Sequence, residues 1–165
     1  MFNVGDKIVY PMHGAGIVES IETKEILGAK QKYYVMKMPI GDIKVMVPTH
    51  NAQDVGIRGI IESKKSKAVL EVLTTGETEI TANWNKRYRD NMEKIKSGDI
   101  FEVADVIRTL AFKQKSKGLS TGERKMFNSA KQILISELVL ANEMEHTEVE
   151  SMVNERIEST FKNLL

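Results

Sequence analysis

The sequence predicts an α+β protein, with a small antiparallel β module at the N-terminus and an all-helical domain after it. Two observations lead to this prediction. Apolar residues alternate with period two from residue 5 to about residue 58, and beyond that point they recur with the period of a helix. The length of 165 residues suits one ordinary domain or two small ones. We place the units at residues 1–60 and 61–165.

Four short strands are expected in the first unit, each ended by a glycine-bearing turn or a proline. Their sequences are "KIVYP", "GIVESIETKEI", "KYYVMKM" and "IKVMVP", with the corners "HGAG", "LGAK" and "PIGD" between them. Alternation places Tyr34, Met36 and Met38 on one face of the third strand. Short strands with such turns indicate a small barrel or a strongly bent sheet.

Several helices are expected in the second unit, and capping residues mark where they begin. A short helix at "KAVLEVL" is followed by one that Asn83 caps and that ends at Ser97-Gly98. Asp99 with Glu102, and Ser120 with Glu123, have the spacing of capping boxes for the next two helices. The last helix is expected at about residues 146–163, with an apolar stripe that reaches Leu164.

Charge is distributed unevenly along a chain whose net charge is only +1. Residues 1–62 have seven cationic and seven anionic side chains, residues 63–125 have 14 and nine, and residues 126–165 have three and seven. A basic middle segment favours a local anionic partner. The sequence contains no cysteine, no apolar run of about 20 residues and no signal-peptide pattern, so a cytoplasmic protein outside the membrane is expected.

No pattern in the sequence favours an enzyme, a cofactor or a metal site. His13, His50 and His146 are far apart, and none has a second ligand at helical spacing. The "HGAG" corner lacks the third glycine of a dinucleotide fingerprint, and "GLSTGERK" lacks the phosphate-loop pattern. An enzyme would need a catalytic cluster that only the folded chain could reveal.

The segment "TANWNKRYRDN" contains the only tryptophan, Trp84, and two interpretations of it stay open on the residues alone. On a helix that advances 100° per residue, Tyr88, Met92 and Ile95 lie within roughly 80° of Trp84, as in a buried stripe. Trp84 also stands at the helix N-terminus, where its ring can overhang the end. The nearby cations favour a nucleic-acid surface; they are Lys86, Arg87, Arg89, Lys94 and Lys96.

A second basic pair, Arg124 and Lys125, opens the longest predicted helix. The N–H groups of a helix N-terminus attract anions, so "STGERK" is a candidate for a backbone phosphate contact. The alternative is a solvated first turn, and the sequence does not decide between them.

The sequence closely resembles the CarD/CdnL family of bacterial transcription regulators from about residue 3 to residue 141. The matching segments are "VGDKIVYPMHGAGIVESIE", "VPTHNAQDVGIR" and the stretch from "NWNKRYRDN" to "ISEL". The most specific motifs are "W-x-x-RY" and "KGLS-x-GE". The first half also resembles the polymerase-interacting module of the transcription-repair coupling factor, but the chain lacks the length and nucleotide loop of that ATPase.

This resemblance implies a fold and a mechanism. A Tudor-like β module would bind the β subunit of bacterial RNA polymerase, and the helical domain would touch promoter DNA at the upstream edge of the bubble. Trp84 matches the family tryptophan that wedges into the minor groove there. Lys86, Arg89 and Arg124 match phosphate-contacting positions, and we add Arg87 and Lys125 to the expected DNA-binding set.

The polymerase contact is expected at Lys24, Lys44 and Met46. Relatives often carry arginine at the positions of Lys24 and Met46. Lys24 keeps the charge without the bidentate fork, whereas Met46 keeps only a flexible apolar contact. Pairing along a sheet edge would not depend on side-chain identity.

The expected function is therefore a non-enzymatic regulator that stabilises the open promoter complex. The rival interpretation places Trp84 in the core of the helical domain. In that case the chain would be a protein–protein adaptor without DNA contact. A monomer is the simplest expectation, and the final acidic helix matches the family least.

Overall fold

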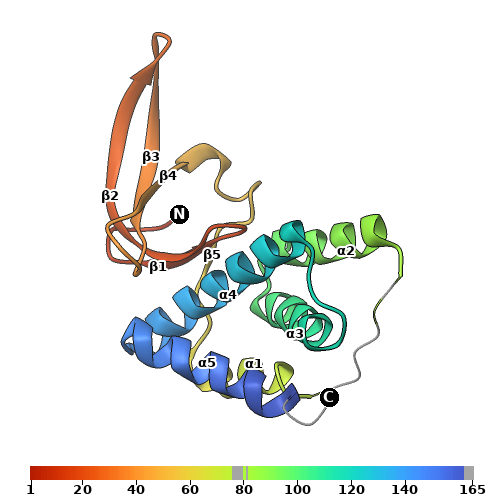
Figure 1. The fold of residues 1–165 in the computed structure, drawn as a ribbon. Helices are drawn as coiled ribbons and strands as arrows, with labels where there is room; N and C mark the ends of the chain where they lie inside the picture. The colour runs from red at the N-terminus through yellow and green to blue at the C-terminus, as the bar shows by residue number, and fades with distance from the viewer. Residues whose placement is uncertain (76–79, 81, 162–165) are drawn as a thin grey trace.

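The computed structural model describes residues 1–75, 80 and 82–161, and it consists of an antiparallel sheet followed by a helical region. The predicted α+β class is confirmed. Figure 1 shows the sheet on one side of the long helix α4 and the remaining helices on the other. The strands are β1 (Lys7–Tyr10), β2 (Gly14–Ile26), β3 (Ala29–Lys37), β4 (Lys44–Pro48) and β5 (Arg58–Gly59).

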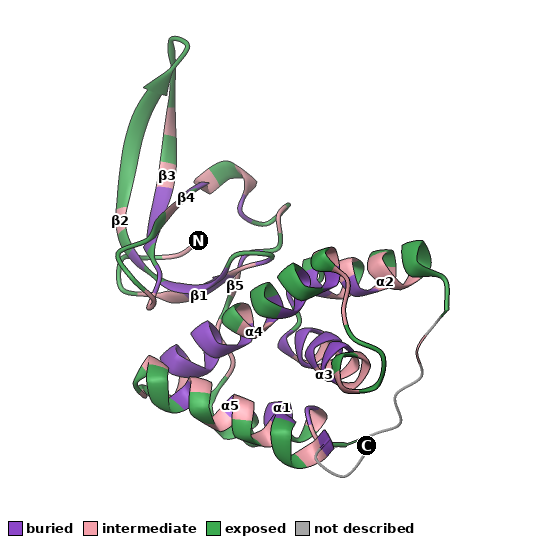
Figure 2. Cartoon of the chain, in the orientation of Figure 1, coloured by how far each residue is buried: buried purple, intermediate pink, exposed green. Residues whose placement is uncertain are grey.

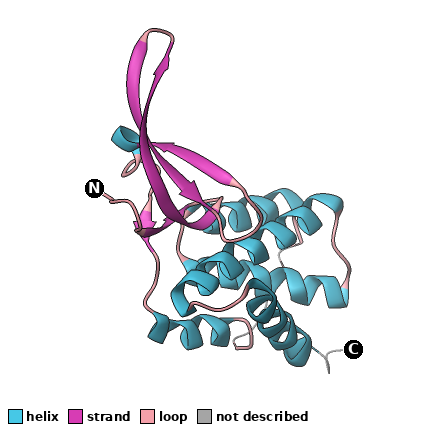
Figure 3. Ribbon diagram, turned by 90° about the vertical axis from the view of Figure 1, so that its left-hand side faces the viewer, coloured by secondary structure: helices cyan, strands magenta, loops and turns pink. Residues whose placement is uncertain are grey.

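The strands follow the order β4-β3-β2-β1-β5, and every neighbouring pair is antiparallel. Strands β2 and β3 form a long hairpin that projects from the body of the protein (Figures 1 and 3). Its turn lies at Leu27 and Gly28, where φ is 52° and 82°, at the predicted corner. A bulge between Val18 and Ser20 shifts the β2–β3 register, with Glu19 as the extra residue.

Two features of the sheet differ from the expectation. Strand β2 begins at Gly14, so most of the "HGAG" corner belongs to the strand and the turn lies earlier, with Met12 at a φ of 76°. The two-residue strand β5 was not expected, because it is too short to show any alternation of apolar residues. It forms when Arg58 and Gly59 pair with Val9 and Ile8 of β1.

The residues that alternation places on one face of the third strand form part of the core of the sheet. Tyr34, Met36 and Met38 are buried, together with Ile8 and Val18 from the neighbouring strands. Burial of a side chain of this size contributes about 1.5–3 kcal/mol, so this cluster is the main stabilising element of a small sheet. Figure 2 shows that the outer half of the hairpin is almost entirely exposed.

The helices begin and end close to the predicted residues. They are α1 (Ser66–Val72), α2 (Trp84–Lys96), α3 (Ile100–Ser116), α4 (Thr121–Asn142) and α5 (His146–Phe161), with short 3₁₀ turns η1 (Thr49–Asn51) and η2 (Ser63–Lys65). Asn83 caps α2, Asp99 caps α3 through the Phe101 N–H, and Ser120 with Glu123 forms a complete capping box on α4. The expected end of the last helix at residue 163, and Leu164, lie outside the described residues.

Apolar stripes on the five helices meet in one core around α4. The apolar stripe of α3 is buried throughout, and Phe127, Ala130, Leu134 and Leu138 of α4 pack on the same cluster. Ile133 and Ala141 on α4 are only partly buried. Within residues 1–75, 80 and 82–161, no helix has the length and apolar character that crossing a membrane requires.

Candidate nucleic-acid interface

Trp84 is the first residue of α2, and its ring is 43% exposed. The ring stacks on Tyr88, one turn further along, with ring centroids 5.1 Å apart and planes inclined by 17°. Tyr88 and Met92 are partly buried against the helical core and Ile95 is fully buried, so the predicted stripe exists. Trp84 lies at the exposed end of that stripe, which confirms the expected partial exposure.

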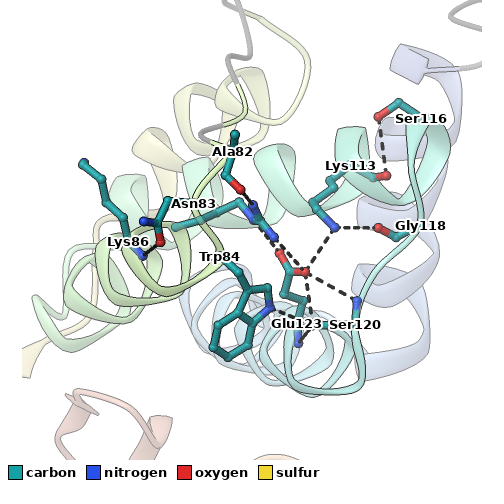
Figure 4. A network of polar contacts seen from close by, with 10 residues as sticks. Ala82, Asn83, Trp84, Lys86, Lys113, Ser116, Gly118, Ser120 and Glu123 are labelled. Atoms are coloured by element: carbon teal, nitrogen blue, oxygen red, sulfur yellow. Dashed lines mark hydrogen bonds and ion pairs between the residues drawn. The ribbon is translucent and has the colours of Figure 1, made fainter.

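The indole is held by the start of α4. Its Nε1–H donates to the hydroxyl of Ser120, the N-cap of α4, at 3.2 Å. Gly122, in the first turn of α4, also faces the two rings, since a Cβ built on it would lie 3.7 Å from Trp84 and 3.8 Å from Tyr88. The N-termini of α2 and α4 therefore meet at the tryptophan, as Figure 4 shows.

Glu123 organises this junction from beneath the surface. Its carboxylate is 2% exposed and accepts hydrogen bonds from Arg87 Nε at 3.0 Å and from Lys113 Nζ at 3.1 Å (Figure 4). It also accepts from the hydroxyl and backbone N–H of Ser120. One buried carboxylate thus joins α2, α3 and α4, and it contacts the residue that holds Trp84.

The surroundings of Glu123 strongly favour its ionised form. Burial by itself would raise the pKa of Glu123, but the hydrogen bonds from Arg87, Lys113 and Ser120 outweigh it and lower the pKa to about 2. Because the carboxylate stays charged at neutral pH, both cations remain fixed beside it. The site is pre-organised around the tryptophan rather than assembled from mobile surface charges.

The cations predicted to contact DNA fall into two groups. Arg89, Arg124 and Lys125 are exposed. Lys86 is also exposed, and its ammonium lies 2.9 Å from Asp90, a solvent-screened pair that is worth little. Arg87 differs from these, since its side chain is only 10% exposed and bound to Glu123. We therefore assign Arg87 to the support of the site and not to its contact surface.

A closer reading of the helical period could have separated Arg87 from its neighbours. Arg87 lies about 60° from Trp84 on a helix that advances 100° per residue, so it falls beside the buried stripe. Glu123 was visible in the sequence only as a capping residue. Its partners Arg87 and Lys113 could not be found from the sequence, because they are 36 and 10 positions away on other helices.

The three residues predicted to contact polymerase share the outer face of the sheet. Met46 of β4 pairs with Val35, which pairs with Ser20 of β2, and alternation places Lys44 and Lys24 on the same face. Lys44 donates to Glu19 at 2.8 Å, and this hydrogen bond lowers the pKa of the Glu19 carboxyl. Strand β4 forms one edge of the sheet. In the described part of the chain, no cluster of three or more His, Cys, Asp or Glu residues could hold a metal ion.

Tryptophan fluorescence checks the exposure of the site directly, because Trp84 is the only tryptophan. We expect a red-shifted emission and stronger quenching by iodide than by caesium, since Lys86, Arg124 and Lys125 attract the anion. The unfolded protein is the control, and the preference for iodide should weaken there. A blue-shifted emission protected from both ions would contradict an exposed ring.

A projecting sheet joined to a helical region with a partly exposed indole among cations has the features of a protein that acts by binding macromolecules. Comparison with known families identifies the particular one. Residues 68–154 match the model of the CarD C-terminal domain, and residues 2–61 match that of the CarD-like/TRCF RID domain. The chain belongs to the CarD family.

A curated relative agrees with this assignment. The chain is 42% identical over 151 residues to a Bacillus subtilis (strain 168) protein, YdeB, which is named as a candidate transcription factor. The match covers 92% of this chain and 99% of the relative. Family membership supports a role as a transcription regulator that interacts with RNA polymerase.

Proposed function

We propose that the protein stabilises open promoter complexes by docking on the β subunit of RNA polymerase and wedging Trp84 into DNA at the upstream edge of the bubble. The observation that carries this proposal is the presentation of Trp84, with its ring 43% exposed yet held by Tyr88 and Ser120. Because these contacts already hold the ring in one orientation, it can occupy an unstacked base step without losing much conformational freedom. The protein works without catalysis, in the cytoplasm and on polymerase-bound DNA.

The exposed cations would hold the DNA backbone on either side of the ring. Lys86 and Arg89 come from α2, and Arg124 and Lys125 come from the first turn of α4, whose free N–H groups also attract phosphate. These contacts are to phosphate, so little sequence specificity is expected. Binding to free duplex should be weak, because undistorted DNA imposes the full cost of unstacking.

The sheet would supply the polymerase contact as a separate unit, residues 1–60. Its outer face presents Lys24, Lys44 and Met46, and the edge strand β4 can accept a further strand from a partner. Residues 61–165 would form the DNA-contacting unit. The alternative, an adaptor with no DNA contact, requires Trp84 to be part of the core, and the exposure of its ring argues against that.

The test is the lifetime of an open complex on one promoter after competitor challenge, with the cognate polymerase. Wild type should prolong the lifetime, whereas Trp84→Ala should lose most of the extension, because the ring that occupies the unstacked step is gone. Polymerase binding should be unchanged, since the sheet is untouched. Asn85→Ala, an exposed neighbour on α2, is the control and should behave as wild type. If Trp84→Ala prolongs the complex as wild type does, the wedge is wrong.

A further inference from the structure

The sheet and the helical region are joined by an ion pair that the proposed function does not yet use. Arg58 of β5 donates from Nη1 and Nη2 to the two carboxylate oxygens of Glu137 on α4, each at 2.8 Å. Glu137 is 2% exposed, and its Oε2 also accepts the Ile61 N–H at 2.9 Å. Two parallel N–H···O bonds fix the direction as well as the distance of a contact.

The same guanidinium also reaches the helix that carries the tryptophan. Arg58 Nε donates to the carbonyl of Gly98 at 2.9 Å, and Gly98 lies just beyond the C-terminal end of α2. Pro11, in the turn between β1 and β2, lies against Gly98, since a Cβ there would be 2.9 Å from the proline ring. One residue of the sheet therefore holds α4 and the end of α2 that is opposite Trp84.

Apolar packing at this junction is small compared with the two cores on either side of it. The junction cluster consists of Val9, Ala15 and Leu140, with Ile60 partly buried beside them. Further polar contacts cross it: the Ala15 N–H donates to Ser136 Oγ at 2.9 Å, and Lys7 Nζ donates to the Leu140 carbonyl at 3.2 Å and to Glu143 Oε1 at 3.5 Å. Because the apolar cluster at the junction is small, directional polar contacts help to set the relative orientation of the two parts.

We propose that Arg58 and Glu137 are positioning residues that hold Trp84 at a set distance and direction from the polymerase-docking face of the sheet. This inference rests on the proposed function. Once the sheet is docked on polymerase, Trp84 meets the DNA within a single complex. The effective concentration of its ring at the unstacked step then depends on how narrowly the ring is positioned. If the junction between the sheet and the helices is loosened, the ring of Trp84 occupies many positions, and most of these do not reach the unstacked step.

The first test removes both members of the pair. Deleting one partner of a buried ion pair usually destabilises a protein severely, because the other charge is left buried without its counter-ion. Arg58→Met/Glu137→Met avoids this by removing both charges. The full-length variant should bind polymerase as wild type does, yet lose about two thirds or more of the open-complex extension, as expected when effective concentration falls. If this variant does not fold, Arg58→Lys serves instead, since it keeps the charge but not the fork.

An engineered disulfide across the junction then distinguishes a loss of positioning from a general loss of stability. The chain has no cysteine, and a Cβ built on Gly14 would lie 2.7 Å from Ser136 Oγ, so cysteines at these two positions are close enough to be joined. Gly14→Cys/Ser136→Cys, added to the double methionine variant, should restore the extension when oxidised and lose it again when reduced. Both redox states share any strain at Gly14, where φ is 109°.

An orientation measurement tests the clamp independently of transcription. Spin labels at Thr23→Cys and Glu93→Cys, both exposed, should give one narrow distance in the wild-type background and a broad distribution with Arg58→Met/Glu137→Met. A narrow distance in both would overturn the inference, as would full open-complex extension by the folded double variant. If Trp84→Ala acts as wild type while the distance broadens, the proposed function fails but the clamp is real.

Discussion

Replacing Glu123 with glutamine should lower the free energy of unfolding by about 3 kcal/mol at pH 7. The substitution keeps the shape of the side chain but leaves the Arg87 and Lys113 charges without their counter-ion beneath the surface. The same value follows from the fall of the carboxyl pKa from 4.5 to about 2, which corresponds to about 3 kcal/mol of stabilisation of the folded state.

The pH dependence identifies the carboxylate as the cause. Because folding lowers the pKa of Glu123, its contribution is fully present above the unfolded pKa and is lost as the pH falls from about 4.5 towards 2. Urea unfolding should therefore show a gap between wild type and Glu123→Gln that is widest above about pH 5 and closes in acid. A gap that stays constant from pH 7 to pH 2.5 would contradict this.

Glu102→Gln is the matched control for Glu123→Gln. Glu102 occupies the same position in the first turn of α3 that Glu123 occupies in α4, three residues beyond the capping residue. It is only half-buried, so its loss should cost a few tenths of a kcal/mol through the helix dipole. Glu123→Gln should also loosen Ser120 and change the quenching of Trp84, whereas Glu102→Gln should not.

Gly98→Ala should destabilise the protein by about 2–3 kcal/mol, for two reasons that combine at the junction. Gly98 has a φ of 75°, which an alanine adopts only with strain. The new methyl would also lie 2.9 Å from the ring of Pro11, and a proline ring has little freedom to move away. Urea unfolding of the two proteins at neutral pH measures the difference.

Gly118→Ala separates the two contributions to the Gly98→Ala effect. Gly118 follows α3 as Gly98 follows α2, with a φ of 82°, but nothing lies within 4 Å of a Cβ built there. Gly118→Ala should cost only the strain of a left-handed alanine, about 1 kcal/mol. Pro11→Ala should relieve part of the Gly98→Ala effect in the double variant. Equal costs at Gly98 and Gly118 would mean that the Pro11 contact has no energetic consequence.

Much of the fold could be predicted because it depends on residues that are close in the sequence. The period of two grouped Tyr34, Met36 and Met38 on one face, and Asn83 and Ser120 identified the beginnings of α2 and α4. Strand β5 was missed because two residues carry no periodic signal, and it exists only where β1 offers an edge to pair with.

The candidate site was predicted less completely. The position of Trp84 at a helix N-terminus, among cations, follows from its neighbours in the chain, and so does the exposure of Arg89, Arg124 and Lys125. Arg87 was grouped with those cations, yet it supports the site through Glu123, which is 36 positions away. Assignment of the remaining cations to DNA, and of Lys24, Lys44 and Met46 to polymerase, stays a prediction.

The sequence by itself determined the two-part architecture, the residues that share a face of each element and the position of Trp84 in the first turn of a helix. These properties follow from local periodicity and capping, which depend only on the residues within each segment. Only the tertiary structure decided which charges became internal. Arg58 and Glu137 are 79 positions apart, and no sequence pattern near either residue indicates that the two side chains will pair away from solvent. A buried ion pair depends on the directions of two separate elements, which no local pattern in the sequence specifies.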